Sequence, residues 1–364
     1  MDFLLLFLKE CRFRSFFLEK IDIKSWNEKE LTEKIIEMKL PKFRAKQIYE
    51  WLHQKSAESF ADMTNIGKKL QEQLDEIFVI RNVEIVRKQK SKIDGTAKYL
   101  FKLHDGEYIE AVLMQYHHGY SICISTQVGC KMGCTFCATG KGGFFRNLSA
   151  SEMLAQIQMA QKDESVRVSN IVLMGMGEPL DNYENVLRFL ELVSGDNGMN
   201  IGMRHISLST CGIVDKIYDL AERKLQLTLS ISLHAPNDEI RGQTMPINKK
   251  WNISELLKAC RYYTNQTSRR ISFEYAMIDG VNDSDEAARE LSQRLKGIIA
   301  HVNLIPVNPV TETGFQKSSI ARQKRFVRIL ESSGISATVR RTLGADIDAS
   351  CGQLRGKFDK EECN

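Results

Sequence analysis

Six short apolar runs alternate with segments of helical period across residues 122–306 of this 364-residue chain. Each run has the length of a strand and is followed by room for a helix, which is the pattern of parallel βα units. Six units are too few to close an eight-stranded barrel. We therefore expect an α/β fold whose core is an open, partial (βα)6 barrel. The runs are Ile122–Val128, Asn170–Met174, His205–Ser209, Leu225–Ser232, Ile271–Ala276 and His301–Pro306.

Two regions of different pattern precede the barrel. Residues 26–80 space their apolar residues as helices do, and basic residues accompany aromatic ones there, a mixture suited to phosphate contact and base stacking. We expect a small helical, RNA-binding accessory domain; aromatic residues packed into its core beside solvated basic residues are the alternative. Residues 81–116 alternate as three strands separated by Asp-Gly turns, which predicts a β meander linker. The basic residues are Lys42, Arg44, Lys46 and Lys55, and the aromatic ones are Tyr49, Trp51 and His53.

The barrel and a C-terminal cysteine loop are expected at 117–356, with an N-terminal extension at 1–25 and a tail at 357–364. The extension begins with an apolar run that is too short to span a bilayer and is not followed by a cleavage site, and no later window is apolar enough for a span. The net charge of +5 is compatible with RNA binding, and nine cysteines indicate a reducing compartment. We therefore expect a cytoplasmic protein without a membrane segment.

The loop after the first apolar run holds three cysteines, Cys130, Cys134 and Cys137, at CxxxCxxC spacing. A structural zinc site closes with four protein ligands, and an electron-carrying 4Fe-4S cluster normally takes four cysteines. Three thiolates without a fourth nearby indicate one 4Fe-4S cluster with an iron left open. The occupant that we expect on this iron is S-adenosylmethionine, bound through its amino and carboxylate groups. A zinc knuckle completed by a distant His or Cys is the alternative.

Polar residues also follow the other apolar runs. Because the carboxyl ends of parallel barrel strands meet at one mouth, these residues are expected to converge on a single pocket. Glu178 beside Gly177 offers an acceptor for the cofactor amino group where the backbone permits a close approach. A single serine at a strand end is more often a helix cap, but the shared position of the set favours a cofactor site. The other expected cofactor-binding residues are Ser209, Ser232, Leu233, His234 and Asn308.

Several further motifs accompany the cysteine loop. They are Gly-Met-Gly-Glu-Pro-Leu at 175–180, Ser-Leu-His-Ala-Pro-Asn at 232–237, Met-Pro-Ile-Asn at 245–248, His-Val-Asn-Leu-Ile-Pro-Val-Asn at 301–308 and Asp-Ile-Asp-Ala-Ser-Cys-Gly-Gln-Leu at 346–354. Together they resemble the dual-specificity RNA adenine-C2 methyltransferases of the radical S-adenosylmethionine superfamily. The resemblance implies methylation of carbon 2 of adenine-2503 in 23S ribosomal RNA and of adenine-37 in tRNA.

The resemblance also assigns roles to three residues outside the cysteine loop. Cys351, in a loop expected to be mobile because Gly352 follows it, would take a methyl group from one S-adenosylmethionine. A second S-adenosylmethionine per turnover would be cleaved by the cluster, and its radical would activate that methyl group for addition to the electron-poor C2. Glu110 would take the C2 proton, and Cys123 would attack the sulfur of Cys351 to leave a transient disulfide.

The partners implied by this resemblance are 23S ribosomal RNA, tRNA, a flavodoxin- or ferredoxin-like electron donor and a cellular dithiol that reduces the disulfide. The enzyme is expected to act as a monomer.

Three other functions are weighed against this one. Adenine-C8 methyltransferases of the antibiotic-resistance branch share most of these motifs but typically carry Ala where this chain has Pro179, which favours C2. A non-catalytic, zinc-stabilised RNA-binding protein would also use clustered cysteines and a basic helical domain. A radical enzyme acting on a small molecule would need neither that domain nor the pair of Cys123 and Cys351.

Departures from the family pattern are small: Cys211 replaces a serine and Ser350 an alanine.

Overall fold

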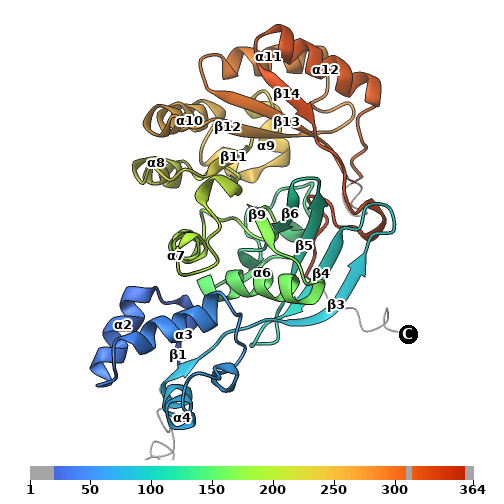
Figure 1. The fold of residues 1–364 in the computed structure, drawn as a ribbon. Helices are drawn as coiled ribbons and strands as arrows, with labels where there is room; N and C mark the ends of the chain where they lie inside the picture. Colours follow the sequence, from blue (N-terminus) through green and yellow to red (C-terminus); the bar gives the residue numbers. More distant parts are fainter. Residues whose placement is uncertain (1–19, 309–313, 357–364) are drawn as a thin grey trace, which may run out of the picture.

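The structure is a computed structural model that describes residues 20–308 and 314–356 (Figure 1). Most of the expected N-terminal extension and the whole expected tail at 357–364 lie outside these residues. Within the described part of the chain, no helix is both long enough and apolar enough to cross a membrane.

The N-terminal region is helical, as expected, and lies at one end of the molecule (Figure 1). It contains α2 (Glu28–Glu37), α3 (Phe43–His53) and α4 (Lys68–Ile77), and a parallel pair of β1 (Ile21–Asp22) with β2 (Phe78–Val79) ties its first residues to its last. Residues 21–25, expected in the extension, therefore pack with this region. Asn27 and Glu30 form a capping box that starts α2, because each side chain satisfies a free backbone N–H of the first turn.

The aromatic residues of α3 divide between the core and the surface. Tyr49 and His53 are buried, so they belong to the core rather than to a base-stacking surface. The Nε1 of Trp51 donates to Asn65 at 2.6 Å. The exposed aromatic ring is Phe43, which is 56% exposed and has the Arg44 guanidinium 4.9 Å above it. Basic and aromatic groups thus share this surface, although Tyr49 and His53 are not among them.

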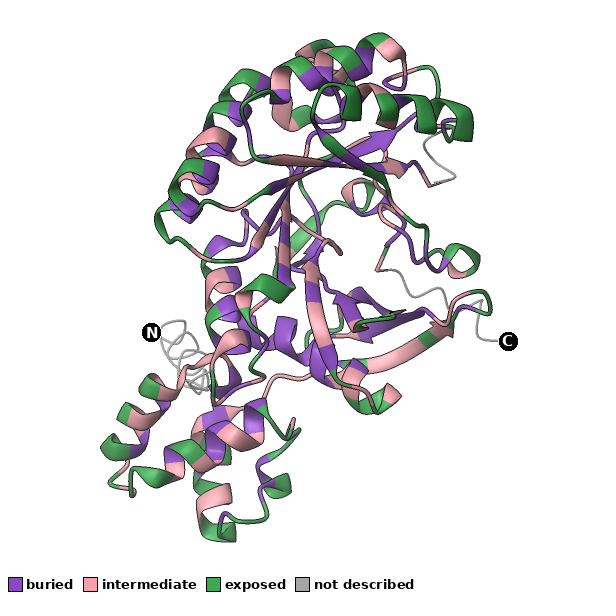
Figure 2. Cartoon of the chain, turned by 45° about the horizontal axis from the view of Figure 1, so that its top comes forward, coloured by how far each residue is buried: buried purple, intermediate pink, exposed green. Residues whose placement is uncertain are grey.

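The core of the molecule is a ten-stranded sheet. Its parallel strands lie side by side in the order in which they occur along the chain. The expected partial barrel is confirmed, and β14 adds a seventh parallel strand beyond the six expected. Buried residues gather along the strands, whereas the covering helices are exposed on their outer faces (Figure 2). The parallel strands are β6 (Gly119–Cys123), β9 (Val168–Leu173), β10 (Ile206–Thr210), β11 (Thr228–Ser232), β12 (Ile271–Met277), β13 (Ala300–Pro306) and β14 (Ser336–Val339). The main covering helices are α6 (Ala150–Glu164), α7 (Tyr183–Ser194), α8 (Val214–Glu222), α10 (Ile253–Thr267), α11 (Asp285–Leu295) and α12 (Ile320–Ser332).

The β meander continues the barrel sheet at its edge. Its strands β3 (Glu84–Lys90), β4 (Ala97–Lys102) and β5 (Tyr108–Tyr116) are antiparallel, and β5 pairs with the first barrel strand, β6, so that Val112 faces Cys123. The meander is therefore part of the same sheet as the barrel strands, and it does more than link two domains.

The first expected strand, Ile122–Val128, is wrong as a single element. β6 ends at Cys123, and Gln127–Gly129 forms β7, which pairs with β8 (Phe144–Asn147) in a separate hairpin. The chain leaves the barrel sheet because side-chain and loop acceptors take over its backbone N–H groups. Ser125 N–H donates to Gln156 Oε1 at 2.9 Å, and Thr126 N–H donates to the Met176 carbonyl at 2.8 Å.

Candidate active site

The three-cysteine loop is anchored by a close contact between two backbone segments. Gly129 has a φ of +74°, and a Cβ there would lie only 2.0 Å from the Gly143 carbonyl oxygen. The N–H of Cys130 donates to the same oxygen at 2.7 Å. Further along the loop, Thr135 N–H donates to the carbonyl of Thr244 at 2.9 Å, at the end of α9 (Asp238–Thr244). The loop is therefore held from two sides, and glycine is required where it begins.

The Gly-Met-Gly segment after β9 is fastened to the residues that lead into the cysteine loop. The N–H of Met176 donates to Ser125 Oγ at 2.9 Å, and its carbonyl accepts from Thr126 N–H at 2.8 Å. Gly177 has a φ of +103°, and a Cβ there would lie 2.6 Å from the Cβ of Gln127. Because only glycine permits this approach, the cysteine loop and the Gly-Met-Gly segment form one unit.

Two buried charged side chains join the loops that follow neighbouring strands. The carboxylate of Glu178 accepts from Leu180 N–H at 3.0 Å and from Cys211 N–H at 2.7 Å, and burial raises its pKa. Arg241 is 1% exposed and donates to the carbonyls of Cys211 at 2.6 Å and Leu233 at 3.2 Å. Glu178 therefore fixes the pocket wall as well as offering oxygens to a ligand, and Arg241 supports the same wall from behind.

His234 is fixed in its neutral form. Its Nδ1 accepts from Ala276 N–H at 2.9 Å, and burial lowers its pKa to about 3, so the remaining ring hydrogen is on Nε2. Phe136 of the cysteine loop packs edge-on against the imidazole with ring centroids 4.9 Å apart. The Ser209 and Ser232 hydroxyls, from neighbouring strands, lie 3.5 Å apart.

These residues border one open pocket of about 970 Å³, which we call the cofactor pocket. It brings together all but one of the expected cofactor and metal ligands, which are far apart in sequence. The exception is Leu233, whose side chain is fully buried and whose carbonyl is bound by Arg241. The expected residues on the pocket wall are Cys130, Cys134, Cys137, Gly177, Glu178, Ser209, Ser232, His234 and Asn308, and Cys351 joins them.

The donor set of this pocket fits a 4Fe-4S cluster, because three cysteine side chains from one loop border it. An iron–sulfur cluster spreads its cysteine ligands over several irons, so three cysteines leave one iron free for another ligand. Burial raises the pKa of Cys130 to about 12, so its thiolate is stable there only with a bound cation.

A second pocket of about 570 Å³, which we call the cysteine pocket, adjoins the first. Cys123 and Cys351 both border it as free thiols, and Cys351, Asn308 and Arg340 border both pockets. The amide of Asn308 donates to the Cys351 carbonyl at 3.1 Å. Burial raises the pKa of Cys123 to about 12; the nearby Cys351 thiol adds to this shift and the Arg340 guanidinium opposes it.

The loop that carries Cys351 is docked on the turn between β3 and β4. The N–H of Gly344 donates to Asp94 Oδ2 at 2.9 Å, and Lys92 N–H donates to Asp346 Oδ2 at 3.0 Å. A Cβ on Gly344, which has a φ of +62°, would lie 2.6 Å from the Cβ of Ala349. The meander thus serves as the platform on which this loop rests, a role that its sequence did not indicate.

Glu110 is not one of the described residues that border either pocket. It contacts the two residues that follow Leu354, which does border the cysteine pocket. Its Oε2 accepts from the N–H groups of Arg355 at 2.5 Å and Gly356 at 3.1 Å, and its Oε1 is 3.7 Å from Lys98 Nζ. In this conformation Glu110 holds the segment that follows Cys351.

Sequence reasoning missed three charged residues at this site, namely the buried Arg241 and Glu274 and the half-buried Arg340. Glu274 is 3% exposed, borders the cofactor pocket and accepts from Asn303 Nδ2 at 2.7 Å. Its presence inside an apolar strand was an available signal, because a buried charge requires partners. Arg340 is placed by the unpredicted β14, and the nearby Cys351 and Glu274 raise its pKa.

Comparison with known proteins agrees with this geometry. Residues 124–291 match the family model described as the radical SAM superfamily, and residues 21–80 match the ribosomal RNA large subunit methyltransferase N-terminal domain. A probable dual-specificity RNA methyltransferase RlmN from Alkaliphilus oremlandii is 55% identical over 340 residues, which cover 93% of this chain and 99% of the relative. One from Clostridium tetani is 52% identical over 339 residues, with coverages of 93% and 95%.

The crystal structure of a radical SAM methyltransferase from Sphaerobacter thermophilus superposes with a TM-score of 0.88 at 43% identity, covering 93% of this chain and all of that one. Sequence similarity across nearly the full length, together with the same fold and a pocket that fits a three-cysteine cluster, establishes the family. The chain belongs to the RlmN family of dual-specificity RNA methyltransferases, within the radical S-adenosylmethionine superfamily.

Proposed function

We propose that this chain methylates carbon 2 of adenine-2503 in 23S ribosomal RNA and of adenine-37 in tRNA. The observation that carries the proposal is the position of Cys351, which borders both the cofactor pocket and the cysteine pocket. A residue in that position is in reach of a methyl donor on one side and of an incoming base and a second thiol on the other. The matching N-terminal domain and the names of the relatives support RNA as the substrate.

In this proposal the chain binds one 4Fe-4S cluster through Cys130, Cys134 and Cys137. When bound, the cluster and two molecules of S-adenosylmethionine supply radical chemistry and a methyl group in each turnover. The residues proposed to bind S-adenosylmethionine are Gly177, Glu178, Ser209, Ser232, His234 and Asn308, and Leu233, which does not border the pocket, is proposed to position its neighbours Ser232 and His234. The buried Glu178 and Arg241 keep these groups in position, because they tie together the loops that carry them.

The chemistry on the RNA is assigned to three residues. Cys351 accepts and presents the methyl group, with its main chain held by Asn308. Glu110 takes the C2 proton, for which its contacts with the Arg355 and Gly356 backbone must open. Cys123 then attacks the Cys351 sulfur, so that the S–S bond forms as the bond between this sulfur and the methylene carbon breaks, and a proton added to that carbon completes the methyl group of the released base.

The partners and organisation complete the proposal. Residues 26–80 bind RNA as an accessory domain beside the 81–116 meander, and residues 117–356 form the catalytic unit. A flavodoxin- or ferredoxin-like protein supplies the electron and a cellular dithiol reduces the disulfide. The enzyme acts as a monomer in the cytoplasm, where both RNA substrates are found.

Nucleoside mass spectrometry tests the product directly. RNA from cells with the gene should contain 2-methyladenosine at both positions, and RNA from cells without it should not. Detection of 8-methyladenosine instead would place the chain in the antibiotic-resistance branch. Colourless, zinc-containing protein from anaerobic purification would overturn the radical mechanism altogether.

Two variants test the assignment of the cysteines. The Cys351→Ala variant should bind the cluster and lose methylation, because the methyl carrier is missing. The Cys123→Ala variant should form the bond to the RNA without resolving it, so a covalent protein–RNA adduct should accumulate. Turnover by Cys351→Ala, or turnover by Cys123→Ala without an adduct, would contradict the respective role.

A further inference from the structure

Arg340 is held where the cofactor pocket and the cysteine pocket meet. It follows β14, and its backbone N–H donates to the carbonyl of Leu304 at 2.8 Å, which fixes the base of its side chain against β13. Arg340 borders both pockets, and Met174, Asn308 and Cys351 are among the other residues that do so. A ligand in either pocket therefore meets this arginine.

The guanidinium of Arg340 has donors without a good acceptor. Within residues 20–308 and 314–356, its hydrogen-bond partner is the sulfur of Met174, which lies 3.7 Å from Nη1. A thioether is a weak acceptor, whereas a guanidinium offers several N–H donors in a planar fork. By contrast, the guanidinium of Arg241 donates to four oxygen atoms of the pocket wall. Arg241 is a structural arginine, and Arg340 retains donors for a ligand.

The charges around Arg340 favour its cationic form but leave its donors free. The Cys351 thiol and the Glu274 carboxylate raise the pKa of the guanidinium, while burial opposes this rise. Glu274 forms no ion pair with Arg340, although the structure describes both residues; its two oxygens instead accept from Ser272 Oγ at 2.9 Å and from Asn303 Nδ2 at 2.7 Å. A half-buried cation with unpaired donors is unfavourable until a ligand supplies acceptors.

The position of Arg340 indicates which part of the proposed RNA substrate it meets. In the proposed reaction, C2 of the target adenine becomes joined through a methylene carbon to the sulfur of Cys351. The ring nitrogens N1 and N3 are both bonded to C2, and each has a lone pair that accepts a hydrogen bond. The phosphates lie on the far side of the ribose. A donor close to Cys351 is therefore nearer to N1 and N3 than to the RNA backbone.

We propose that Arg340 is a catalytic residue whose guanidinium donates a hydrogen bond to a ring nitrogen next to C2 of the target adenine. This inference rests on the proposed function, because it presupposes that Cys351 carries the carbon that adds to C2. As the C–C bond forms, the unpaired electron of the methylene carbon pairs with one electron of a C2–N π bond, and the other electron of this bond is left on the ring. A fixed cationic donor stabilises the electron density that moves to the nitrogen. No proton leaves Arg340, since a guanidinium stays ionised in proteins.

The test measures formation of the protein–RNA adduct in the Cys123→Ala background. The adduct does not decay in this parent, so the effect of Arg340 on the Cys123 thiol cannot contribute. Arg340→Met is added to the parent, and Arg341→Met, which removes a neighbouring charge at the border of the cysteine pocket, is the matched control. Each protein is first methylated on Cys351, which mass spectrometry verifies. It then reacts in a single turnover with RNA whose target nucleotide is adenosine, 1-deazaadenosine or 3-deazaadenosine.

With adenosine RNA, Arg340→Met should form the adduct at least about tenfold more slowly than its parent, because it loses a hydrogen bond from a charged donor. Arg341→Met should form it as fast as the parent does. Each deaza nucleotide replaces one ring nitrogen by C–H and so removes one acceptor. On the deaza RNA that lacks the accepting nitrogen, the parent should be slow and Arg340→Met should be no slower.

Equal rates of adduct formation by Arg340→Met and its parent on adenosine RNA would overturn the proposal. So would a loss that persists undiminished on both deaza RNAs, because the guanidinium would then bind another part of the RNA, such as a phosphate. Failure of Arg340→Met to take up the methyl group on Cys351 would also overturn it, since Arg340 would then serve the cofactor. Failure of the proposed function is distinguishable from these outcomes, because the parent itself would then form no adduct with adenosine RNA.

Discussion

The burial of Cys123 predicts how the final step of the proposed reaction depends on pH. Its side chain is 8% exposed, and burial raises its pKa from 9.0 to about 12. A shift of about three units corresponds to about 4 kcal/mol against the thiolate. At pH 7 the thiolate fraction is then about 1 in 10⁵, compared with about 1 in 10² for an unperturbed thiol. The thiolate is the attacking form, so this fraction limits resolution of the adduct.

The expected result is a rate of adduct decay that rises about tenfold per pH unit from pH 7 to pH 10 without a plateau, since the thiolate fraction stays below saturation throughout. The measurement is a single turnover with RNA deuterated at C2, quenched at intervals and separated on a denaturing gel to follow the protein–RNA adduct. Deuteration should not change the decay rate, which separates disulfide formation from loss of the C2 proton.

The neighbouring Arg340 provides a second perturbation of the same step. Its guanidinium opposes the rise in the Cys123 pKa, so Arg340→Met should slow adduct decay at every pH while Arg341→Met serves as a neighbouring control. A decay rate that levels off below pH 9, or one that does not change with pH, would refute the argument that a buried thiol with a high pKa limits resolution.

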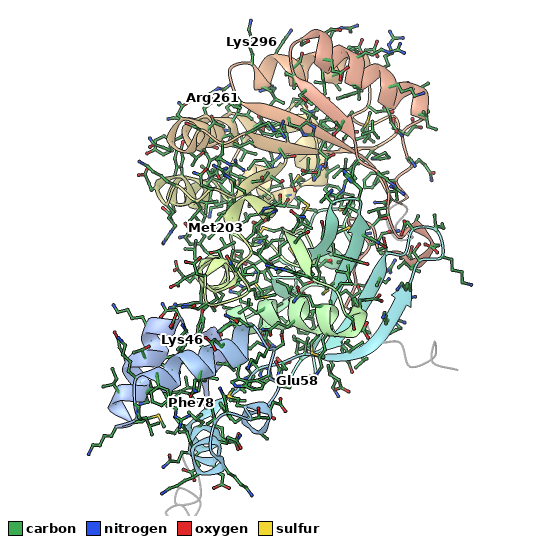
Figure 3. All side chains as sticks on the ribbon, in the orientation of Figure 1. Lys46, Glu58, Phe78, Met203, Arg261 and Lys296 are labelled. Carbon is green, nitrogen blue, oxygen red and sulfur yellow. The ribbon has the colours of Figure 1, made fainter. Side chains whose placement is uncertain are left out.

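Three further predictions concern the groups around this pocket and the N-terminal domain. Asp94→Ala should remove the acceptor for Gly344 N–H and lower the rate of methyl transfer to Cys351 several-fold, measured by mass spectrometry of the protein, without loss of iron. Glu110→Gln should give an adduct that keeps the C2 proton, detected by digestion and mass spectrometry; normal turnover would exclude its role as base. Replacing three basic residues of the N-terminal domain with Ala should weaken RNA binding and lower the slope of log Kd against log salt by up to about 2, whereas Lys296→Ala, at the other end of the molecule (Figure 3), should change neither. Those three residues are Lys42, Arg44 and Lys46.

The amino-acid sequence is sufficient for features that depend on local pattern. Strand positions and the convergence of their C-terminal loops follow from apolar runs and helical spacing, which correctly place Glu178, Ser209 and His234 on one pocket wall. The break at Cys123 could not be foreseen, because the groups that end β6 come from Gln156 and Met176.

Contacts between residues far apart in sequence account for most of the rest. Glu110 meets the backbone of Arg355 and Gly356 across about 245 positions, and Asp94 meets Gly344 across 250. Neither contact can be predicted from a periodic sequence pattern, because each forms only when the whole sheet has folded. Arg241 differs, because its four acceptors lie only 7 to 30 positions away, on the three segments that hold Cys211, Ser232 with Leu233, and Asn248.

The structure also changes how Cys351 must act in the proposed reaction. The loop was expected to be mobile because a glycine follows Cys351, and in the structure the carbonyl of Gly352 accepts from Ala138 N–H at 2.8 Å and that of Leu354 accepts from Thr139 Oγ1 at 2.7 Å. With its own carbonyl held by Asn308, Cys351 is anchored on both sides of the chain. From this position, rotation of its side chain is sufficient to turn the sulfur between the cofactor pocket and the cysteine pocket, both of which it borders. In the proposed reaction the reactants then come to a carrier whose loop rests on the meander, through the contacts of Gly344 with Asp94 and of Asp346 with Lys92.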